Sequence, residues 1–325
     1  MERSPDWLSL CTDGTDLAAE DAAALETHLL KSSNDIEARA KLLGFYFTSP
    51  DDDSQQRRAD HIHWLIAHRP EIHLGAFARI HPEYYPDAYN EAKRLWLSTV
   101  SNSPDDLAVL RNAGSFLASE DPDIAEELYK RGAAIDPGTS DWRQLLGGLH
   151  FTSSSRSTSS EERTRFAREA LAEYEAALTL ERCSLEALGI LMDIADAAVM
   201  SENYERATEA AERLLADAAD HADTFQYGNA VHYAHITLGK IALARNDPAS
   251  AAEHLRAAGE VRGSPQLNTF GPDFELASRL LSMGQRDAVV DYIDGCKKFW
   301  ESGASRLAKW TLAIERGETP DFSKR

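Results

Sequence analysis

Histidine is the residue type whose spacing in this sequence first suggests chemistry. Five of the eleven histidines fall within HIHWLIAHRPEIHLGAFARIHP, at His61, His63, His68, His73 and His81. A metal site needs imidazoles that converge, commonly at positions i and i+4 of one helix face. On a helix, His61 and His63 diverge by about 160°, whereas His61 and His68 share a face but lie about 10 Å apart along the axis. The spacing favours separate surface or interface histidines, and we expect no metal site.

A second group of polar side chains lies in the C-terminal third. His232 and His235 are three residues apart in GNAVHYAHITLG and could converge, but no third metal ligand accompanies them. Further along, SPQLNTFGP carries side-chain amides, which donate and accept at once and suit recognition of a peptide backbone or a small polar molecule. One hypothesis is a polar pocket formed by Asn229, His232, Gln266 and Asn268. The alternative is that these amides satisfy orphan backbone groups between helices.

Motifs of known catalytic chemistry are missing from the sequence. It contains no Gly-rich phosphate loop, nucleophile elbow, paired zinc motif or kinase signature. Carboxylates are abundant, but on amphipathic helices they usually face solvent. We therefore expect no catalytic residue and no cofactor, and a small-ligand sensor or cryptic enzyme stays only as the alternative for the polar pocket.

The elements that must position these residues are repeated helices. Small, aromatic and proline positions recur at the same offsets: Ala92, Trp96, Thr99 and Pro104, then Ala125, Tyr129, Gly132 and Pro137. The clearest copy, residues 107–137, closely resembles the tetratricopeptide repeat, in which each unit is two antiparallel helices with small residues where they cross. The resemblance implies an all-α fold, a right-handed α-solenoid whose units stack on their neighbours.

The number of copies and their boundaries follow from sliding this pattern along the chain. We expect about seven tetratricopeptide-like hairpins, with terminal capping helices at residues 17–31 and 303–316. The most damaged copy has room for only a short first helix between Ile72 and Ile80, because Pro82 and Pro86 follow.

The predicted organisation has five parts: a flexible N-terminal segment at 1–16, repeats over 17–152, a Ser-rich loop at 153–160, repeats with the capping helix over 161–316, and a tail at 317–325. We place a lobe boundary at the Ser-rich loop because it lacks apolar residues. The alternative is a longer loop within one continuous superhelix.

Charge and cysteine content narrow the partners and the compartment. The net charge of −20 argues against extended contact with nucleic acid or with anionic membranes, whereas a basic protein partner is compatible with it. The alternative is an acidic surface that only keeps the protein dispersed. Cys11, Cys183 and Cys296 form no metal-like spacing, and nothing suggests disulfides. Without an apolar leader or a membrane-length run, the sequence predicts a cytoplasmic protein.

The inner surface of the predicted solenoid offers a binding site. In tetratricopeptide arrays the first helix of each pair lines the concave side, and the resemblance implies these inward positions: Leu107, Leu110, Gly114 and Leu117, then Gly189, Met192, Asp196 and Val199, then Tyr233, Ile236, Lys240 and Leu243. The large apolar members define the predicted partner-binding groove: Leu107, Leu110, Leu117, Met192, Val199, Tyr233, Ile236 and Leu243. The alternative is that the superhelix winds tightly and these residues pack together as core.

The candidate occupants of such a groove are a partner's helix or extended segment, a second copy of the chain, or the chain's own N-terminal segment. A second resemblance covers Gly228 to Trp300, with GNAVHYAH, LGKIAL, SPQLNTFGP and CKKFW, which looks like the C-terminal part of uncharacterised bacterial tetratricopeptide-like proteins and implies a bacterial origin. The sequence therefore predicts a non-enzymatic protein-interaction scaffold. The further alternative is a homo-oligomerisation module.

Overall fold

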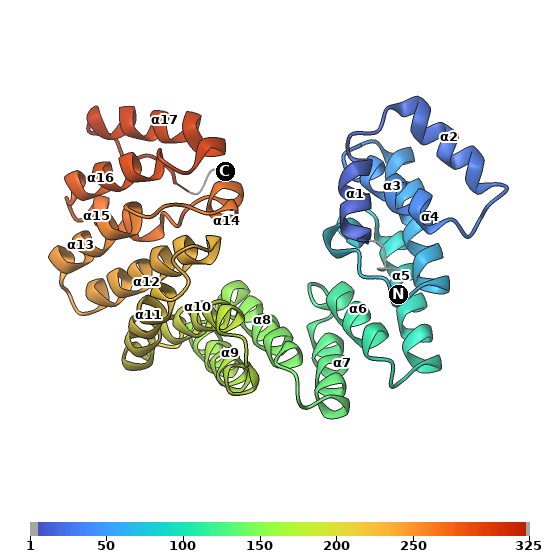
Figure 1. The fold of residues 1–325 in the computed structure, drawn as a ribbon, viewed down its shortest axis with the longest axis horizontal. Helices are drawn as coiled ribbons and strands as arrows, with labels where there is room; N and C mark the ends of the chain where they lie inside the picture. The colour runs from blue at the N-terminus through green and yellow to red at the C-terminus, as the bar shows by residue number, and fades with distance from the viewer. Residues whose placement is uncertain (1–5, 323–325) are drawn as a thin grey trace. The chain divides into compact units, whose positions relative to one another are not determined.

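The computed structural model describes residues 6–322, and within that range the chain is all-helical, with no β-strand. Contacts between Cα atoms divide the chain into two compact units, Met1–Pro137 and Gly138–Arg325. The predicted all-α class is confirmed, and successive helices pack as adjacent pairs (Figure 1). In the described part of the chain, no helix has both the length and the apolar character needed to cross a bilayer.

The first unit is built from seven α-helices and one short 3₁₀ helix within its described residues. These are α1 (Trp7–Gly14), α2 (Ala19–Leu29), α3 (Ile36–Phe47), α4 (Asp52–His68), η1 (Gly75–Ala78), α5 (Pro86–Asn102), α6 (Leu107–Leu117) and α7 (Pro122–Ile135). From α3 to α7 each helix packs against the next one in the chain, and α1 and α2 both pack against α3. Neighbours in sequence are therefore neighbours in space.

The second unit follows the same rule with longer helices. These are α8 (Asp141–Arg156), α9 (Ser160–Leu180), α10 (Ser184–Met200), α11 (Tyr204–Ala219), α12 (Phe225–Ala244), α13 (Pro248–Gly259), α14 (Pro265–Phe270), α15 (Glu275–Ser282), α16 (Arg286–Cys296), η2 (Glu301–Gly303) and α17 (Ala304–Glu315). Successive helices pack together from α8 to α13, and α13, α15, α16 and α17 continue the stack. The helix α12 also reaches back to α10 and forward to α15.

Short polar side chains and prolines define where many of these helices begin. The side chains of Asp35, Asp106 and Asn203 each accept a hydrogen bond from a backbone N–H in the first turn of α3, α6 and α11. Such a cap satisfies a donor that has no partner inside the helix. Pro122 and Pro248 occupy the first turns of α7 and α13, where the missing N–H costs nothing.

Small residues at the helix crossings allow the close packing that the repeat pattern predicts. Ala113 and Ala125, from the clearest copy, are both fully buried between α6 and α7. Along α11, the buried face consists of four alanines and a leucine: Ala207, Ala210, Ala211, Leu214 and Ala218. Alanine side chains let helix axes approach closely, so α11 packs at short distance against its neighbouring helices.

The N-terminal segment differs from its prediction. Residues 7–14 of the segment expected to be flexible form α1, capped by Asp6, and residues 1–5 lie outside the described residues. Cys11 is fully buried, and a Cβ atom on Gly14 would lie 2.0 Å from the carbonyl oxygen of Lys41 in α3. The glycine therefore permits a backbone contact with α3 that fixes α1 on the first unit.

Two further segments can be compared with their predictions. The short helix expected between Ile72 and Ile80 is present as the 3₁₀ helix η1, ahead of Pro82 and Pro86. The Ser-rich stretch 153–160 separates no lobes: α8 continues to Arg156, and Ser159 caps α9 directly afterwards. The division of the chain falls earlier, after Pro137, so the serines connect two packed helices of one unit.

The C-terminal end of the chain packs on the second unit. The predicted helix at 303–316 is present as α17, and its apolar positions Leu307 and Ile314 are fully buried. Phe322, in the segment expected to be a tail, stacks on Phe274 at a ring distance of 5.3 Å and contacts Trp310 edge-on. These residues close the apolar end of the unit.

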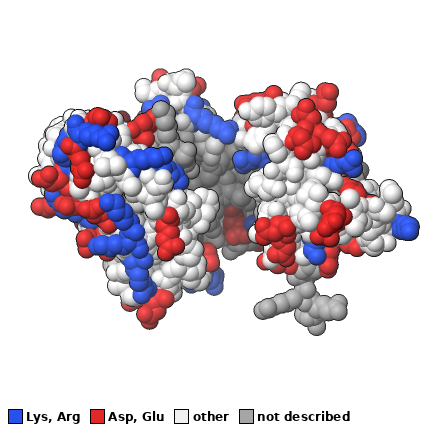
Figure 2. Space-filling view, turned by 90° about the horizontal axis from the view of Figure 1, so that it is seen from above, with Lys and Arg blue, Asp and Glu red and all other residues white. Residues whose placement is uncertain are grey.

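Charged side chains cover much of the outer surface. In the face that Figure 2 shows, acidic residues predominate on the first unit, at the right, whereas both signs are interspersed on the second unit, at the left. Many of the ion pairs are between exposed partners, such as Arg213 and Asp217 within α11. Exposed pairs of this kind contribute little to stability.

Candidate functional site

The candidate site is a row of charged residues on the second unit, which we call the acidic strip: Asp193, Asp196, Lys240, Asp273 and Glu275. The two aspartates belong to α10 and the lysine to α12, which packs against α10. Asp273 precedes α15 and accepts a hydrogen bond of 2.6 Å from the backbone N–H of Glu275. The strip therefore crosses three helices that the stack places side by side.

Lys240 is the cation of the strip, and it pairs with two of the carboxylates. Lys240 Nζ lies 2.9 Å from Asp273 Oδ2 and 2.9 Å from Glu275 Oε2. The lysine side chain is only 13 % exposed and that of Asp273 is 23 % exposed, so this pair is shielded from solvent, whereas Glu275 is largely exposed. The strip therefore contains four carboxyl groups and one cation, which pairs with two of them.

The surroundings shift the pKa of three carboxyl groups of the strip. Desolvation, and secondarily the nearby charge of Asp196, raises the pKa of Asp193 to about 7. Desolvation also raises the pKa of Asp196 to about 6, against the opposing effect of Lys240. Burial opposes the ionisation of Asp273 too, but the ammonium of Lys240 outweighs it and keeps that pKa below its usual value. An added cation would relieve this crowding of negative charge.

Apolar side chains on the same helix faces border the acidic strip. In α10, Met192, Asp196 and Val199 follow the i, i+4, i+7 spacing of one face, and in α12 Tyr233 and Lys240 are seven residues apart. Met192, Val199 and Tyr233 are all partly exposed. The strip thus combines carboxylates with apolar anchors.

The strip ends at a cleft of about 790 Å³ in the second unit. Tyr233, Asp273 and Glu275 line it together with aromatic residues, among them Phe274, Trp300 and Trp310. The guanidinium of Arg306 lies 4.8 Å from the ring centroid of Trp300, a cation–π contact in which the chain itself supplies the cation. Aromatic faces beside carboxylates favour positively charged groups.

The other residues predicted to line the groove are less available. Leu110, Leu117, Ile236 and Leu243 are buried in the cores of their own units, with exposed fractions between 0 and 6 %, and Leu107 is partly exposed. The alternative in which inward side chains pack together as core describes these four buried residues. They cannot contact a partner without unfolding, so the accessible part of the predicted groove in the second unit is Met192, Val199 and Tyr233.

The predicted polar pocket is brought together only in part, and its groups bond one another. Asn229 Nδ2 donates to Gln266 Oε1 at 2.7 Å, and the hydroxyl of Ser264 donates to Asn229 Oδ1 at 2.5 Å. Ser264 also caps α14, the short helix that occupies most of the SPQLNTFGP segment. Asn229 is buried, so its amide fixes α14 on α12.

The remaining two members of the predicted pocket are also engaged within the protein. His232 is fully buried; its Nδ1 donates to the carbonyl of Ala258 at 2.9 Å, and its Nε2 accepts the N–H of Asp273 at 3.4 Å. Because a carbonyl only accepts, this pattern assigns the proton to Nδ1. The Oδ1 atom of Asn268 accepts from the backbone N–H of Glu301 at 2.9 Å. These contacts match the structural alternative for the amides.

Each described histidine in the stretch 61–81 has its own surroundings. His61 lies between Arg39 and Glu26, His63 bonds the carbonyl of Ala88, and His68 stacks on Trp64. Within residues 6–322, no three His, Cys, Asp or Glu side chains are grouped as metal ligands would be. His61 and His63 instead join α4 to other helices of the first unit, whereas His68 contacts a residue of its own helix.

The acidic strip includes residues that the sequence pattern did not single out. Asp196 and Lys240 stood among the inward positions, but that face was interpreted as apolar, and Asp193, Asp273 and Glu275 were missed. One signal was available: Asp193 and Asp196 interrupt the otherwise apolar run of α10, LGILMDIADAAVM, at a spacing that places both on one side.

Two comparisons with known proteins identified no relative. Neither the protein-family models nor the curated proteins compared with this sequence gave a match. The fold and the site define an all-helical protein of paired, stacked helices that carries an acidic surface strip bordered by apolar residues.

Proposed function

We propose that this protein is a non-enzymatic interaction scaffold, a right-handed solenoid of tetratricopeptide-like hairpins whose second unit binds a basic segment of a partner protein. The observation that carries the proposal is the acidic strip itself. It contains four carboxyl groups and a single cation, Lys240, which pairs with Asp273 and Glu275, and half-buried apolar side chains lie beside it.

The charge of the strip determines which partner fits it. One lysine balances only one of the four carboxylates, so lysines or arginines of a partner would find uncompensated negative charge. Their ammonium or guanidinium groups would favour ionised Asp193 and Asp196, whose pKa values are raised without a partner. Binding is therefore expected to weaken as salt rises.

Apolar contacts would supply the remaining free energy. Met192, Val199 and Tyr233 offer three partly exposed anchors along two neighbouring helices. Full burial of an exposed apolar side chain contributes about 1.5–3 kcal/mol of binding free energy. The contribution of each of these three is smaller, because they are already half-buried in the free protein. A partner segment with alternating basic and apolar residues matches this surface.

Site-specific photo-crosslinking tests the proposal. The full chain carries a benzophenone amino acid at position 192 or 233, and a control carries it at Glu212, an exposed residue of α11. We expect a crosslinked protein from the native cell extract at 192 and 233, lost when salt is raised, and not at 212. The crosslinked partner segment should be rich in Lys and Arg.

Three outcomes would count against the proposal. Equal crosslinking at all three positions would indicate non-specific contact, and an acidic partner segment would contradict the role of the strip. Crosslinking to a second copy of the same chain, together with a concentration-dependent sedimentation coefficient, would favour the homo-oligomerisation alternative.

A further inference from the structure

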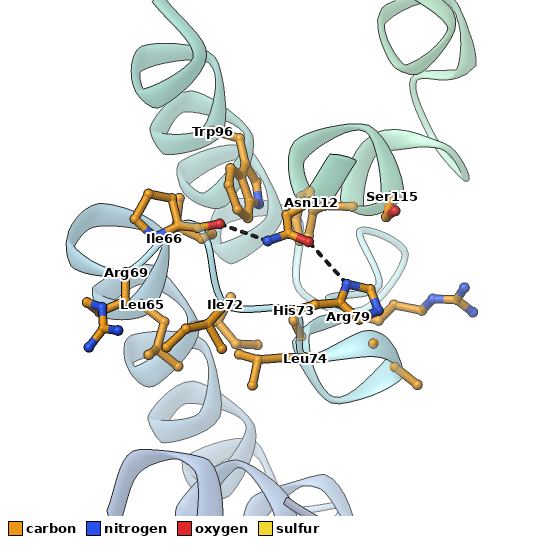
Figure 3. A pocket seen from close by; sticks show the side chains of 16 residues that line it. Leu65, Ile66, Arg69, Ile72, His73, Leu74, Arg79, Trp96, Asn112 and Ser115 are labelled. Carbon is orange, nitrogen blue, oxygen red and sulfur yellow. Dashed lines mark hydrogen bonds between the residues drawn. The ribbon is translucent and has the colours of Figure 1, made fainter. Parts of the chain in front are cut away.

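The first unit contains a cavity that the proposed scaffold function does not use. It has a volume of about 270 Å³ and lies between α4, the segment from Arg69 to Arg79, α5 and α6. Seven large apolar side chains line it: Ile62, Leu65, Ile66, Ile72, Leu74, Trp96 and Phe116. Figure 3 shows Leu65, Ile72 and Leu74 on one side of this space and the Trp96 ring on the other.

A fixed polar group forms one side of the cavity. Asn112 is 7 % exposed; its Nδ2 donates to the carbonyl of Pro70 at 2.8 Å, and its Oδ1 accepts from His73 Nδ1 at 3.1 Å (Figure 3). Since both amide atoms are engaged, Asn112 ties α6 to the segment that follows α4. The cavity is therefore held open by hydrogen bonds between its walls.

One buried donor beside the cavity has no acceptor among the residues that the structure describes. Trp96 is 6 % exposed, its ring borders the cavity, and its Nε1–H makes no hydrogen bond to any described residue. Buried polar groups are nearly always paired, and leaving one unpaired costs about 1–3 kcal/mol. The Nε1 atom is closed off as the ring stands, and a small turn of the indole would bring this donor to an acceptor oxygen on a bound molecule.

The charged residues around the cavity are all basic. Arg69 and Arg79 line it, and no Asp or Glu does, although the chain has 54 acidic and only 34 basic residues. Arg69 pairs with Glu71 at 2.6 Å, whereas the guanidinium of Arg79 has no partner among the described residues and extends from the rim (Figure 3). A long, exposed arginine side chain can turn towards an anion at the opening.

We propose that this cavity binds a small carboxylic acid with an apolar, ring-sized body. An apolar cavity of about 150 Å³ holds one benzene molecule, so 270 Å³ accommodates a ring together with a short acidic side chain. The ring lies among the aliphatic walls, a carboxylate oxygen accepts the Trp96 indole N–H, and Arg79 supplies the opposite charge. This site lies within the first unit and is independent of the acidic strip.

The indole N–H signals of the full chain provide the test. The probes are 3-phenylpropionate, its neutral amide 3-phenylpropionamide, and acetate, each titrated to about 10 mM while the indole ¹H–¹⁵N signals are followed. Comparison with Trp96→Phe assigns the Trp96 signal. We expect 3-phenylpropionate to shift that signal downfield and saturably, the amide to bind at least about tenfold more weakly, and acetate to leave it unchanged.

Variants at two exposed arginines separate the role of Arg79 from general charge. Arg79→Gln should weaken 3-phenylpropionate binding at least about fivefold, whereas Arg57→Gln, an exposed position of α4 outside the cavity lining, should not change it. Three results would overturn the proposal: a Trp96 signal unmoved by the acid, equal affinity for the acid and the amide, or equal binding by Arg79→Gln and the wild type.

Discussion

Gly147 in α8 lies directly beneath the ring of Tyr174 in α9: a Cβ atom at position 147 would lie 2.5 Å from Cε1 of the tyrosine. Gly114 in α6 has the same relationship with Tyr129 in α7, at 2.4 Å. Two helix pairs, one in each unit, therefore use the same device. A glycine opposite a buried aromatic ring lets the two helices of a pair approach closely.

Gly147→Ala should destabilise the second unit. The added methyl group must push a ring that is buried, and overpacking of this kind costs about 1–3 kcal/mol, more than the gain of up to about 1 kcal/mol in helix propensity. Gly189→Ala in α10 is the matched control, because a Cβ there meets nothing within 4 Å, and it should stabilise by about 0.5–1 kcal/mol. Urea unfolding followed by circular dichroism measures both, and equal effects would contradict the Gly147–Tyr174 contact.

Lys240→Met should destabilise the second unit by about 3 kcal/mol, because it leaves the shielded carboxylate of Asp273 without its cation. Arg213→Met, which breaks the exposed pair with Asp217 in α11, should change stability by no more than about 0.5 kcal/mol. The same unfolding measurement compares them. A loss for Lys240→Met no larger than that for Arg213→Met would mean that the strip is freely hydrated.

His232 should make the second unit less stable in acid. Desolvation lowers the pKa of His232 to about 4, so between its unfolded pKa of about 6.5 and pH 4 the unfolded chain binds the extra proton. The contribution is fully present above pH 6.5 and falls by on the order of 3 kcal/mol as pH drops to 4. His235 and His254, whose pKa values burial also lowers, act in the same direction.

The variant His232→Gln isolates this effect, because the other titrating groups remain. Its free energy of unfolding should fall less between pH 7 and pH 4 than that of the wild type. Parallel pH profiles for the two proteins would show that His232 is protonated in the folded state or reached by solvent.

The three cysteines should differ in reactivity. Cys183 is exposed, whereas Cys11 and Cys296 are fully buried, and burial raises the pKa of the Cys11 thiol to about 12 and raises that of Cys296 as well. With a thiol reagent at about pH 8, one thiol should react rapidly in the native protein and all three in denaturant. Rapid reaction of a second thiol would place α1 or α16 away from its packed position.

Local sequence patterns were sufficient to predict the all-α class and much of the helix order. The offsets that contain Ala92, Ala125 and Gly132 predicted helix pairs, because small residues at a helical period are needed wherever two helices cross. The capping helix α17 was predicted for a similar reason, from the periodic spacing of Leu307, Trp310 and Ile314. The right-handed solenoid and the tetratricopeptide relationship stay predictions.

Only the tertiary structure decided which polar groups have partners and which apolar ones reach the surface. Lys240 and Asp273 are 33 residues apart, and Trp96, Arg79 and Asn112 come from three different segments, so no short-range pattern connects them. Leu110 and Met192 occupied equivalent positions in the pattern, yet one is buried and the other partly exposed. Periodicity fixes the face of a helix on which a side chain lies, whereas its burial depends on the angle and distance at which the neighbouring helices pack.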